Sequence, residues 1–203
     1  LMADVPHALP RGVPPARMRD LKKRLADQGQ GVSNVNAFTL FACGDTYHPT
    51  WIEDSPDRRK QRIEHTLGAI DLAAAFGAPT VSLQPGGPMI GTGLFYDDAA
   101  RRFADGLRAV LPRARRLKIT LAIEPEPFCH IERASELVRF LEERVYSGQG
   151  REAIARALPG LDVDVPQDLE VVRDEADRAD EHALHAVRVQ VVELVQDVGP
   201  EPG

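Results

Sequence analysis

Short apolar segments alternate with amphipathic helical segments along most of this 203-residue chain. Residues 119–123 are a nearly continuous apolar run of strand length, and residues 32–38 and 80–83 form further expected strands. Between the strands at residues 32–38 and 80–83, apolar residues recur at helical spacing, at Ile63, Leu67, Ile70 and Ala74. Strands with little alternation, separated by amphipathic helices, predict an α/β fold in which helices cover a parallel sheet.

Start and stop signals bound four expected helices. These are residues 15–28, a helix between Ser55-Pro56-Asp57 and Gly77, a helix capped by Asp97, and a last helix with Leu137, Leu141 and Val145 on its buried face. The repeat of strand, loop and helix fits a doubly wound sheet or a (β/α) barrel. Since no glycine fingerprint for a dinucleotide or phosphate loop follows any strand, the sequence favours the barrel.

The last part of the chain differs in composition from the rest. All 11 aromatic residues precede residue 147, and residues 160–203 contain 12 acidic residues against three arginines. Without aromatic side chains, this part lacks the largest contributors of buried area to a core. We therefore expect residues 156–203 to be an acidic, helical tail or a segment of different origin, rather than an independent domain. The alternation of Val187, Val189 and Val191 also allows a strand there.

Composition also excludes some classes of protein. No apolar run approaches the ~18 residues that a membrane helix needs, so no membrane partner is expected. Cys43 and Cys129 form neither a disulfide framework nor a zinc motif, which favours the reducing cytoplasm. The formal net charge of −6 argues against nucleic acid as the main partner.

Polar residues follow each expected strand at the point where it ends. Asn34 and Asn36 lie toward the end of the first strand, Gln84 follows the second, and Glu124 and Glu126 follow the third. Because ligands bind at the carboxyl ends of parallel strands, this group suits a small polar ligand such as a sugar. The alternative is that these residues simply mark where each strand reaches water.

The loop after the first strand adds His48 and Trp51 to the candidates for substrate binding. A packed loop that contacts no ligand explains these two residues equally well. Glu124 is harder to explain as solvated, because a carboxylate directly after a buried strand needs a compensating charge. A paired cation or a divalent metal would supply that charge, and oxygen ligands suit Mg²⁺ or Mn²⁺.

Four segments together resemble the xylose isomerase-like TIM-barrel superfamily, most closely its sugar phosphate isomerase/epimerase-like branch. They are Asn34-Val35-Asn36-Ala37-Phe38, the loop from Gly44 to Trp51, Ser82-Leu83-Gln84-Pro85-Gly86-Gly87-Pro88 and Ile123-Glu124-Pro125-Glu126-Pro127. The similarity covers about residues 15–147. It implies that residues 1–155 form an incomplete (β/α)8 barrel, about half of one, with the acidic helical tail attached.

The resemblance implies a metal-assisted isomerase or epimerase that moves a proton next to a carbonyl of a sugar or polyol derivative. Glu124 would be the metal ligand and a catalytic residue, and Glu126 would act as acid or base. His48, Trp51, Gln84 and Asn36 would bind the substrate. The metal would be Mg²⁺, Mn²⁺ or Zn²⁺, with Asp162 or Asp164 as candidates for a further ligand.

Departures from the family pattern suggest a rival interpretation. The first barrel strand is expected to be missing, and Phe128 stands where a glycine is expected after the Glu-Pro-Glu-Pro turn. No motif of the later strands follows residue 150, so we expect a fragment of a longer barrel. The rival is a non-catalytic half-barrel that assembles with a partner chain, for instance a second copy in a homo-oligomer. A nuclease of the same superfamily, acting on apurinic sites, is disfavoured by the acidic charge.

Overall fold

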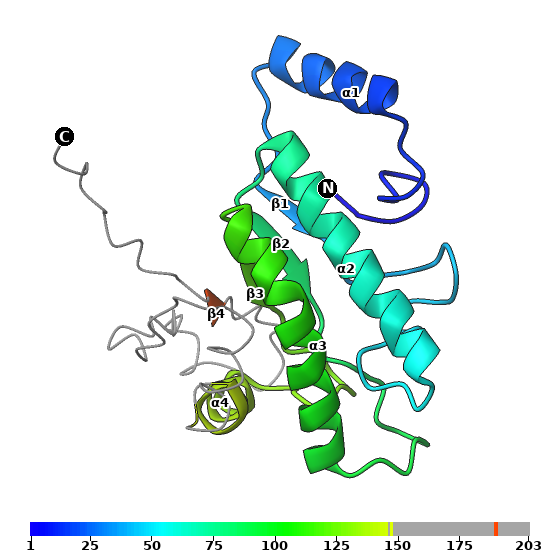
Figure 1. Ribbon diagram of the computed structural model, residues 1–203, viewed down its shortest axis with the longest axis vertical. Coiled ribbons are helices and arrows are strands. Elements are labelled where there is room, and N and C mark those ends of the chain that lie inside the picture. The colour runs from blue at the N-terminus through cyan, green and yellow to red at the C-terminus, as the bar shows by residue number, and fades with distance from the viewer. Residues whose placement is uncertain (146, 148–188, 191–203) are drawn as a thin grey trace, which may run out of the picture.

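The computed structural model describes residues 1–145, 147, 189 and 190 (Figure 1). The predicted boundary at residue 155 lies outside these residues, and so does most of the predicted acidic helix. The two described residues within that helix, Val189 and Gln190, form the short strand β4 instead. The elements are α1 (Pro15–Asp27), β1 (Asn34–Asn36), α2 (Pro56–Phe76), β2 (Thr80–Leu83), α3 (Tyr96–Arg116), β3 (Thr120–Ile123), α4 (Ala134–Phe140), a π-helical turn (Leu141–Val145) and β4 (Val189–Gln190).

The sheet has the order β1-β2-β3-β4, and its first three strands are parallel. Asn36 lies opposite Ser82, and Leu83 opposite Ile123, while β4 runs antiparallel to β3. Residues 1–3 lie along the other edge of β1, where Met2 forms a parallel bridge with Asn36. The expectation that nothing occupies the place of a first strand is therefore wrong, although the stretch that fills it is short.

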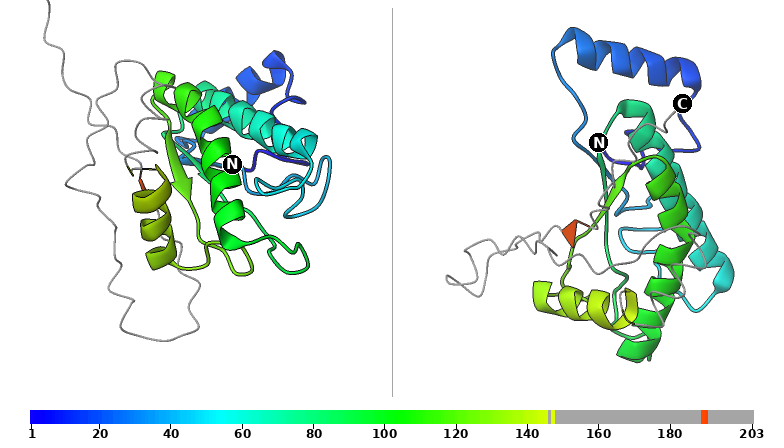
Figure 2. Two further views of the ribbon diagram at one scale, coloured as in Figure 1. Left: turned by 60° about the horizontal axis from the view of Figure 1, so that its bottom comes forward. Right: turned by 60° about the vertical axis from the view of Figure 1, so that its left-hand side comes forward.

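The two faces of the sheet differ in chemistry. Val35, Val81 and Leu121 occupy one register row, and all three belong to the apolar core beneath α2 and α3. The opposite face carries small or polar residues, namely Asn34, Asn36, Thr80, Ser82, Thr120 and Ala122. In Figures 1 and 2, α2 and α3 lie side by side over the same face of the sheet. Helices on one face only are the arrangement of a (β/α) barrel, which confirms the partial barrel over a doubly wound sheet.

Local signals explain where the long helices begin and end. The Ser55 hydroxyl accepts the Arg58 N–H at 3.4 Å, and Gly77 ends α2 in the left-handed conformation with φ of 73°. Helix α3 begins two residues earlier than expected, so Asp97 lies in its first turn and does not cap it. The acidic residues in that turn and the arginines in the last turn both interact favourably with the helix dipole.

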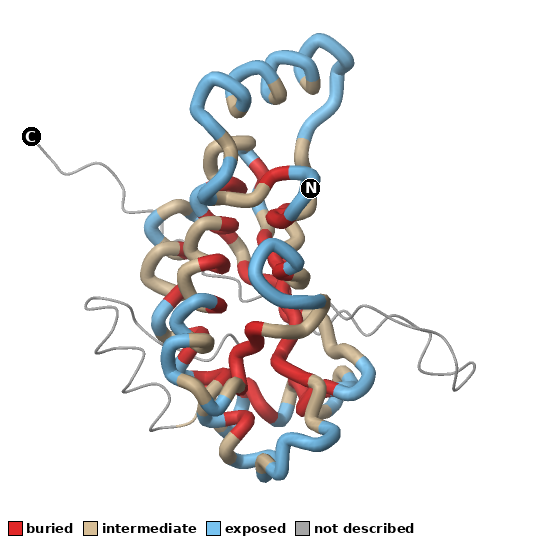
Figure 3. The backbone as a smooth tube through the Cα atoms, turned by 90° about the vertical axis from the view of Figure 1, so that its right-hand side faces the viewer, coloured by how far each residue is buried: buried red, intermediate tan, exposed pale blue. Residues whose placement is uncertain are grey.

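Burial differs strongly among the helices, as Figure 3 shows. Helix α1 forms as predicted, but none of its residues is buried. The buried face of α2 is rotated from the predicted one, because Arg62, His65 and Thr66 are buried while Ile63 is only partly buried. Leu137, Leu141 and Val145 are buried as expected. Within the described part of the chain, no helix combines the length and apolarity needed to cross a membrane.

Candidate active site

The ends of the parallel strands bring three of the predicted residues to one edge of the sheet. Gln84 and Glu124 each follow directly after the paired residues Leu83 and Ile123, and the Glu124 N–H donates to the Leu83 carbonyl at 3.0 Å. Asn36 lies opposite Ser82, two positions before Gln84. The Asn36 Oδ1 accepts the Phe38 N–H at 2.8 Å, so its amide NH₂ is the group left for a ligand.

Glu124 and Glu126 are both half-buried and influence each other electrostatically. Burial raises the pKa of Glu126, and the nearby charge of Glu124 raises it further. A carboxyl group can act as a base and then as an acid, and a raised pKa makes its carboxylate the stronger base. The pair therefore has the chemistry of an acid/base site.

Tyr47 belongs to the same group, although it was not among the predicted site residues. Burial raises the pKa of Tyr47, with smaller contributions from Glu126 and Cys129. Its hydroxyl therefore stays protonated and can donate a hydrogen bond. Its position next to His48 in the loop after β1 was the only signal in the sequence.

Gln84 is fully buried at the base of this edge. Its Oε1 accepts hydrogen bonds from the Gly86 N–H and, at 3.9 Å, from the Cys129 thiol. Its Nε2 has no partner among the described residues. A buried amide donor without a partner is costly, so a ligand oxygen at this position would relieve the cost.

Cys129 does not provide a nucleophile for this site. Burial raises the pKa of its thiol to about 12, with Glu126 and Glu132 contributing. The thiolate is the reactive form of cysteine, and this environment suppresses it. His130, the next residue, is also buried, and burial lowers its pKa to about 4. It is therefore neutral at physiological pH.

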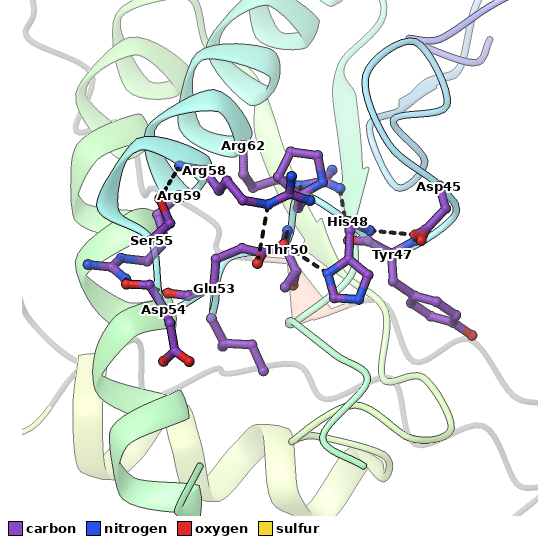
Figure 4. A network of polar contacts seen from close by, with 12 residues as sticks. Asp45, Tyr47, His48, Thr50, Glu53, Asp54, Ser55, Arg58, Arg59 and Arg62 are labelled. Atoms are coloured by element: carbon purple, nitrogen blue, oxygen red, sulfur yellow. Dashed lines mark hydrogen bonds and ion pairs between the residues drawn. The ribbon is translucent and has the colours of Figure 1, made fainter. Parts of the chain in front are cut away.

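His48 is held in place by Glu53 (Figure 4). Glu53 Oε1 lies 2.8 Å from His48 Nδ1 and accepts the Thr50 N–H at 3.0 Å. Although burial raises the pKa of Glu53, the hydrogen bonds from His48 and Thr50 lower it below its usual value. Because Glu53 is ionised, Nδ1 carries the proton, and Nε2 remains for a ligand.

Arg62 of α2 is buried beneath the same loop, and sequence reasoning missed it. Its guanidinium donates to the carbonyl oxygens of Pro49 at 2.6 Å, Ala37 at 2.9 Å and Phe38 at 3.0 Å (Figure 4). Burial lowers its pKa to about 10, so it keeps its charge at neutral pH. Arg62 thus fixes the path of the loop that carries Tyr47 and His48.

The structure does not bring Trp51 to the strand ends. Its side chain is 2% exposed, meets Phe103 edge-on with ring centroids 5.6 Å apart, and packs closely over Gly106 of α3. A cavity of about 260 Å³ outside the sheet is lined by Trp51, Asp54, Arg59, Ile63, Arg101, Arg102, Asp105 and Gly106. The alternative of a packed loop describes Trp51 better than a place beside the carboxylates.

The described residues do not form a complete metal site. Glu124 and Glu126 supply carboxylate oxygens, which suit a divalent cation, but no group of three histidine, cysteine, aspartate or glutamate residues in residues 1–145 could hold one. The candidates Asp162 and Asp164 lie outside the described residues. The predicted binding of Mg²⁺, Mn²⁺ or Zn²⁺ therefore stays a prediction.

Helices on one face of a parallel sheet, with carboxylates at the carboxyl ends of its strands, define a (β/α)-barrel protein with a polar site at the barrel mouth. The chain belongs to the xylose isomerase-like TIM barrel family, whose model matches residues 3–145. This confirms the resemblance that the sequence motifs indicated. No protein of curated function matches the sequence.

The chain is similar to solved structures at low sequence identity. The 3-keto-D-glucoside 4-epimerase of E. coli is 14% identical with a TM-score of 0.51, over 63% of this chain and 49% of its own. A Mycobacterium smegmatis protein of the same barrel type, in complex with magnesium, is 16% identical with a TM-score of 0.49, over 66% and 44%. A Sinorhizobium meliloti protein is 23% identical with a TM-score of 0.48, over 69% and 54%. The chain thus spans about half the length of these proteins.

Proposed function

We propose that this chain carries part of the active site of an isomerase or epimerase acting on a sugar or polyol derivative. The observation that supports this most directly is the pair of half-buried carboxylates, in which burial and Glu124 raise the pKa of Glu126. In this proposal, Glu126 takes the proton from a carbon next to a carbonyl, which leaves an enediolate. Isomerisation follows when Glu126 returns the proton to the neighbouring carbon while the hydroxyl proton of the first carbon moves to the former carbonyl oxygen. Epimerisation instead needs a second proton donor, on the opposite face of the carbon that lost its proton.

The groups around the pair bind the substrate oxygens. The unpartnered Gln84 Nε2 donates to a hydroxyl or carbonyl oxygen, as does the Tyr47 hydroxyl. His48, fixed by Glu53, offers Nε2 as an acceptor for a hydroxyl proton. Donors placed where charge develops on a carbonyl oxygen stabilise the enediolate that proton removal creates.

A divalent metal belongs to the proposal only through Glu124, as one donor of a set that the described residues do not complete. The proton transfer is therefore assigned to Glu126 without a metal-dependent step. Calorimetric titration of the full chain with Mn²⁺ tests the metal role separately. Micromolar binding that Glu124→Ala abolishes would support it, and no binding to the wild-type chain would contradict it.

Solvent exchange tests the proton transfer in the full chain. Aldoses and ketoses of five and six carbons are incubated in D₂O, and NMR detects deuterium on the carbon next to the carbonyl. We expect exchange with at least one sugar, and a fall of about 10²- to 10⁴-fold in rate for Glu126→Gln. Glu142→Gln is the matched control, because Glu142 is exposed on the π-helical turn.

Exchange that is unaffected by Glu126→Gln would contradict the proposal, as would no exchange with any sugar. The second of these outcomes would favour the non-catalytic half-barrel. That alternative requires a partner, so sedimentation of the full chain should then show a homo-oligomer. A monomer at micromolar concentration would contradict the self-assembling form of this alternative.

A further inference from the structure

The turn after the carboxylate pair contains an aromatic residue in a conformation that favours glycine. The Cys129 N–H donates to the Glu126 carbonyl at 3.1 Å, which closes a four-residue turn with Pro127 and Phe128 at its centre. Phe128 has φ of 71°. Proline second and positive φ third define a type II turn, whose third position is normally glycine. The sequence expectation of a glycine here therefore has a structural reason.

Burial does not compensate for this strain, because Phe128 is 56% exposed. A bulky residue with positive φ costs free energy, and an exposed ring recovers little of it by packing. Strained residues concentrate at functional sites, where the strain serves a purpose other than stability. Phe128 is thus both strained and exposed.

The backbone of Phe128 is nevertheless fixed on both sides. Its N–H donates to Glu132 Oε1 at 2.8 Å, and its carbonyl accepts the Met89 N–H at 2.8 Å. The second bond ties this turn to the loop after β2, in which Ile90 is 75% exposed. The backbone of Phe128 is therefore held at a defined place, two residues after Glu126 in the chain.

We propose that Phe128 is a specificity-determining residue that stacks on the apolar C–H face of the substrate's sugar ring. This inference rests on the proposed function and names the class of substrate as sugars that bind in the closed-ring form, before the ring opens to expose the carbonyl. An exposed aromatic ring on a fixed backbone, in the turn that follows the carboxylates, is well suited to a sugar, which presents hydroxyls at its edge and C–H groups on its face. The ring contributes affinity, while Glu126 carries the proton.

Two substitutions by glycine separate an effect on sugar binding from the relief of backbone strain. Phe128→Gly and Lys118→Gly each remove a non-glycine residue with positive φ, since Lys118 has φ of 56°. Lys118 lies just before β3, at the opposite end of that strand from Phe128. Both variants should therefore raise Tm, but only Phe128→Gly should weaken sugar binding. Phe128→Trp, which keeps an aromatic face, should bind like the wild type.

Affinity is measured by saturation-transfer NMR with methyl β-D-glucopyranoside, and KM by deuterium exchange with any sugar that reacts. We expect Phe128→Gly to raise Kd and KM by about 2- to 10-fold and to change kcat by less than 2-fold. Equal Kd and KM in wild type and Phe128→Gly would overturn the inference, even if exchange proceeds and the proposed function stands. Absence of glucoside binding to the wild type would also overturn it.

If exchange fails but Phe128→Gly still weakens glucoside binding, the stacking role stands and the proposed function fails. If Phe128→Gly instead changes only the oligomeric state in sedimentation, Phe128 belongs to an interface between copies. That outcome would overturn the stacking role.

Discussion

The loops after β1 and β3 lie at the same edge of the sheet but are built in opposite ways. In the loop after β1, the buried charges have partners, since Arg62 donates to backbone carbonyls and Asp4 accepts the N–H groups of Phe41 and Ala42. In the loop after β3, Glu124 and Glu126 raise each other's electrostatic energy, and Phe128 is strained. One loop is stabilised, and the other holds unfavourable arrangements in place.

This contrast indicates which residues perform chemistry. Charges that satisfy a loop's backbone contribute to stability and leave little reactivity for a ligand. Groups left with repulsion or strain are the ones that a substrate could relieve, and such groups cluster at functional sites. The loop after β1 therefore provides a rigid support for His48 and Tyr47, and the loop after β3 provides the reactive groups.

Among the substitutions that test this contrast, the removal of the buried Arg62 should lower the free energy of unfolding the most. Arg62→Ala leaves three loop carbonyls without their charged donor, and a buried unsatisfied polar group costs about 1–3 kcal/mol. We expect the free energy of unfolding to fall by at least about 3 kcal/mol in urea denaturation at pH 7. Arg58→Ala is the control on the same helix.

Arg58 lies 3.4 Å from Glu53, and its side chain is 43% exposed. Such an exposed ion pair contributes about 0–1 kcal/mol, so Arg58→Ala should change stability little. Equal losses in the two variants would show that the loop does not depend on Arg62. The two loops would then not differ in the way that the hydrogen bonds indicate.

Asp4→Asn should have the next largest effect, and one that depends on pH. Burial alone would raise the pKa of Asp4, but the N–H groups of Phe41, Val5 and Ala42 lower it below its usual value. A lowered pKa in the folded state stabilises the protein above the unfolded pKa, and this stability is lost as pH falls through the folded pKa. We expect Asp4→Asn to cost about 1–3 kcal/mol at pH 7.

The cost of Asp4→Asn should shrink as the pH falls below about 4, because Asp4 then takes up a proton in the unfolded state before it does so in the folded state. Urea denaturation at a series of pH values measures both free energies. A cost that is constant down to pH 2 would contradict the proposed role of the carboxylate charge. Asp45→Asn offers a comparison at an exposed carboxylate, whose pKa is lowered mainly by the His48 N–H.

The parts of this structure that local patterns determine could be predicted from the sequence. An apolar run predicted β3, the short segment between Gly77 and Pro85 predicted β2, and the proline and glycine signals predicted the bounds of α2. Glu124 could be placed at the edge of the sheet because it follows a buried strand directly. These predictions need only the spacing of apolar residues along the chain and the positions of its proline, glycine and capping residues.

Contacts between distant segments could not be predicted in this way. Arg62 bonds to carbonyls up to 25 residues away, in a loop whose path no period describes. Asp4 likewise bonds to Phe41 over a separation of 37 residues. The partners of Arg62 and Asp4 are backbone groups, which every residue carries, so no residue type in the sequence marks them. The predicted buried face of α2 was wrong for the same reason, because Arg62 is buried on that helix.

The smallest expected effect, and the only stabilising one in this series, is that of Glu126→Gln on the fold. Burial and the Glu124 charge raise the pKa of Glu126, so its charged form is less favourable in the folded than in the unfolded state. Wild-type Glu126 therefore lowers stability progressively as pH rises above its usual pKa of 4.5. Glu126→Gln removes this charge and should gain less than about 1 kcal/mol at pH 7.

The gain from Glu126→Gln should vanish below the usual pKa, where wild-type Glu126 is also neutral. Urea denaturation at pH 7 and pH 4 compares it with Glu142→Gln, which removes an exposed charge from the π-helical turn and should change stability little at either pH. A loss of stability at pH 7 would mean that Glu126 has a favourable partner and that both loops hold satisfied charges. A gain that disappears in acid would instead mean that the residue assigned to proton transfer is retained at a cost to the fold.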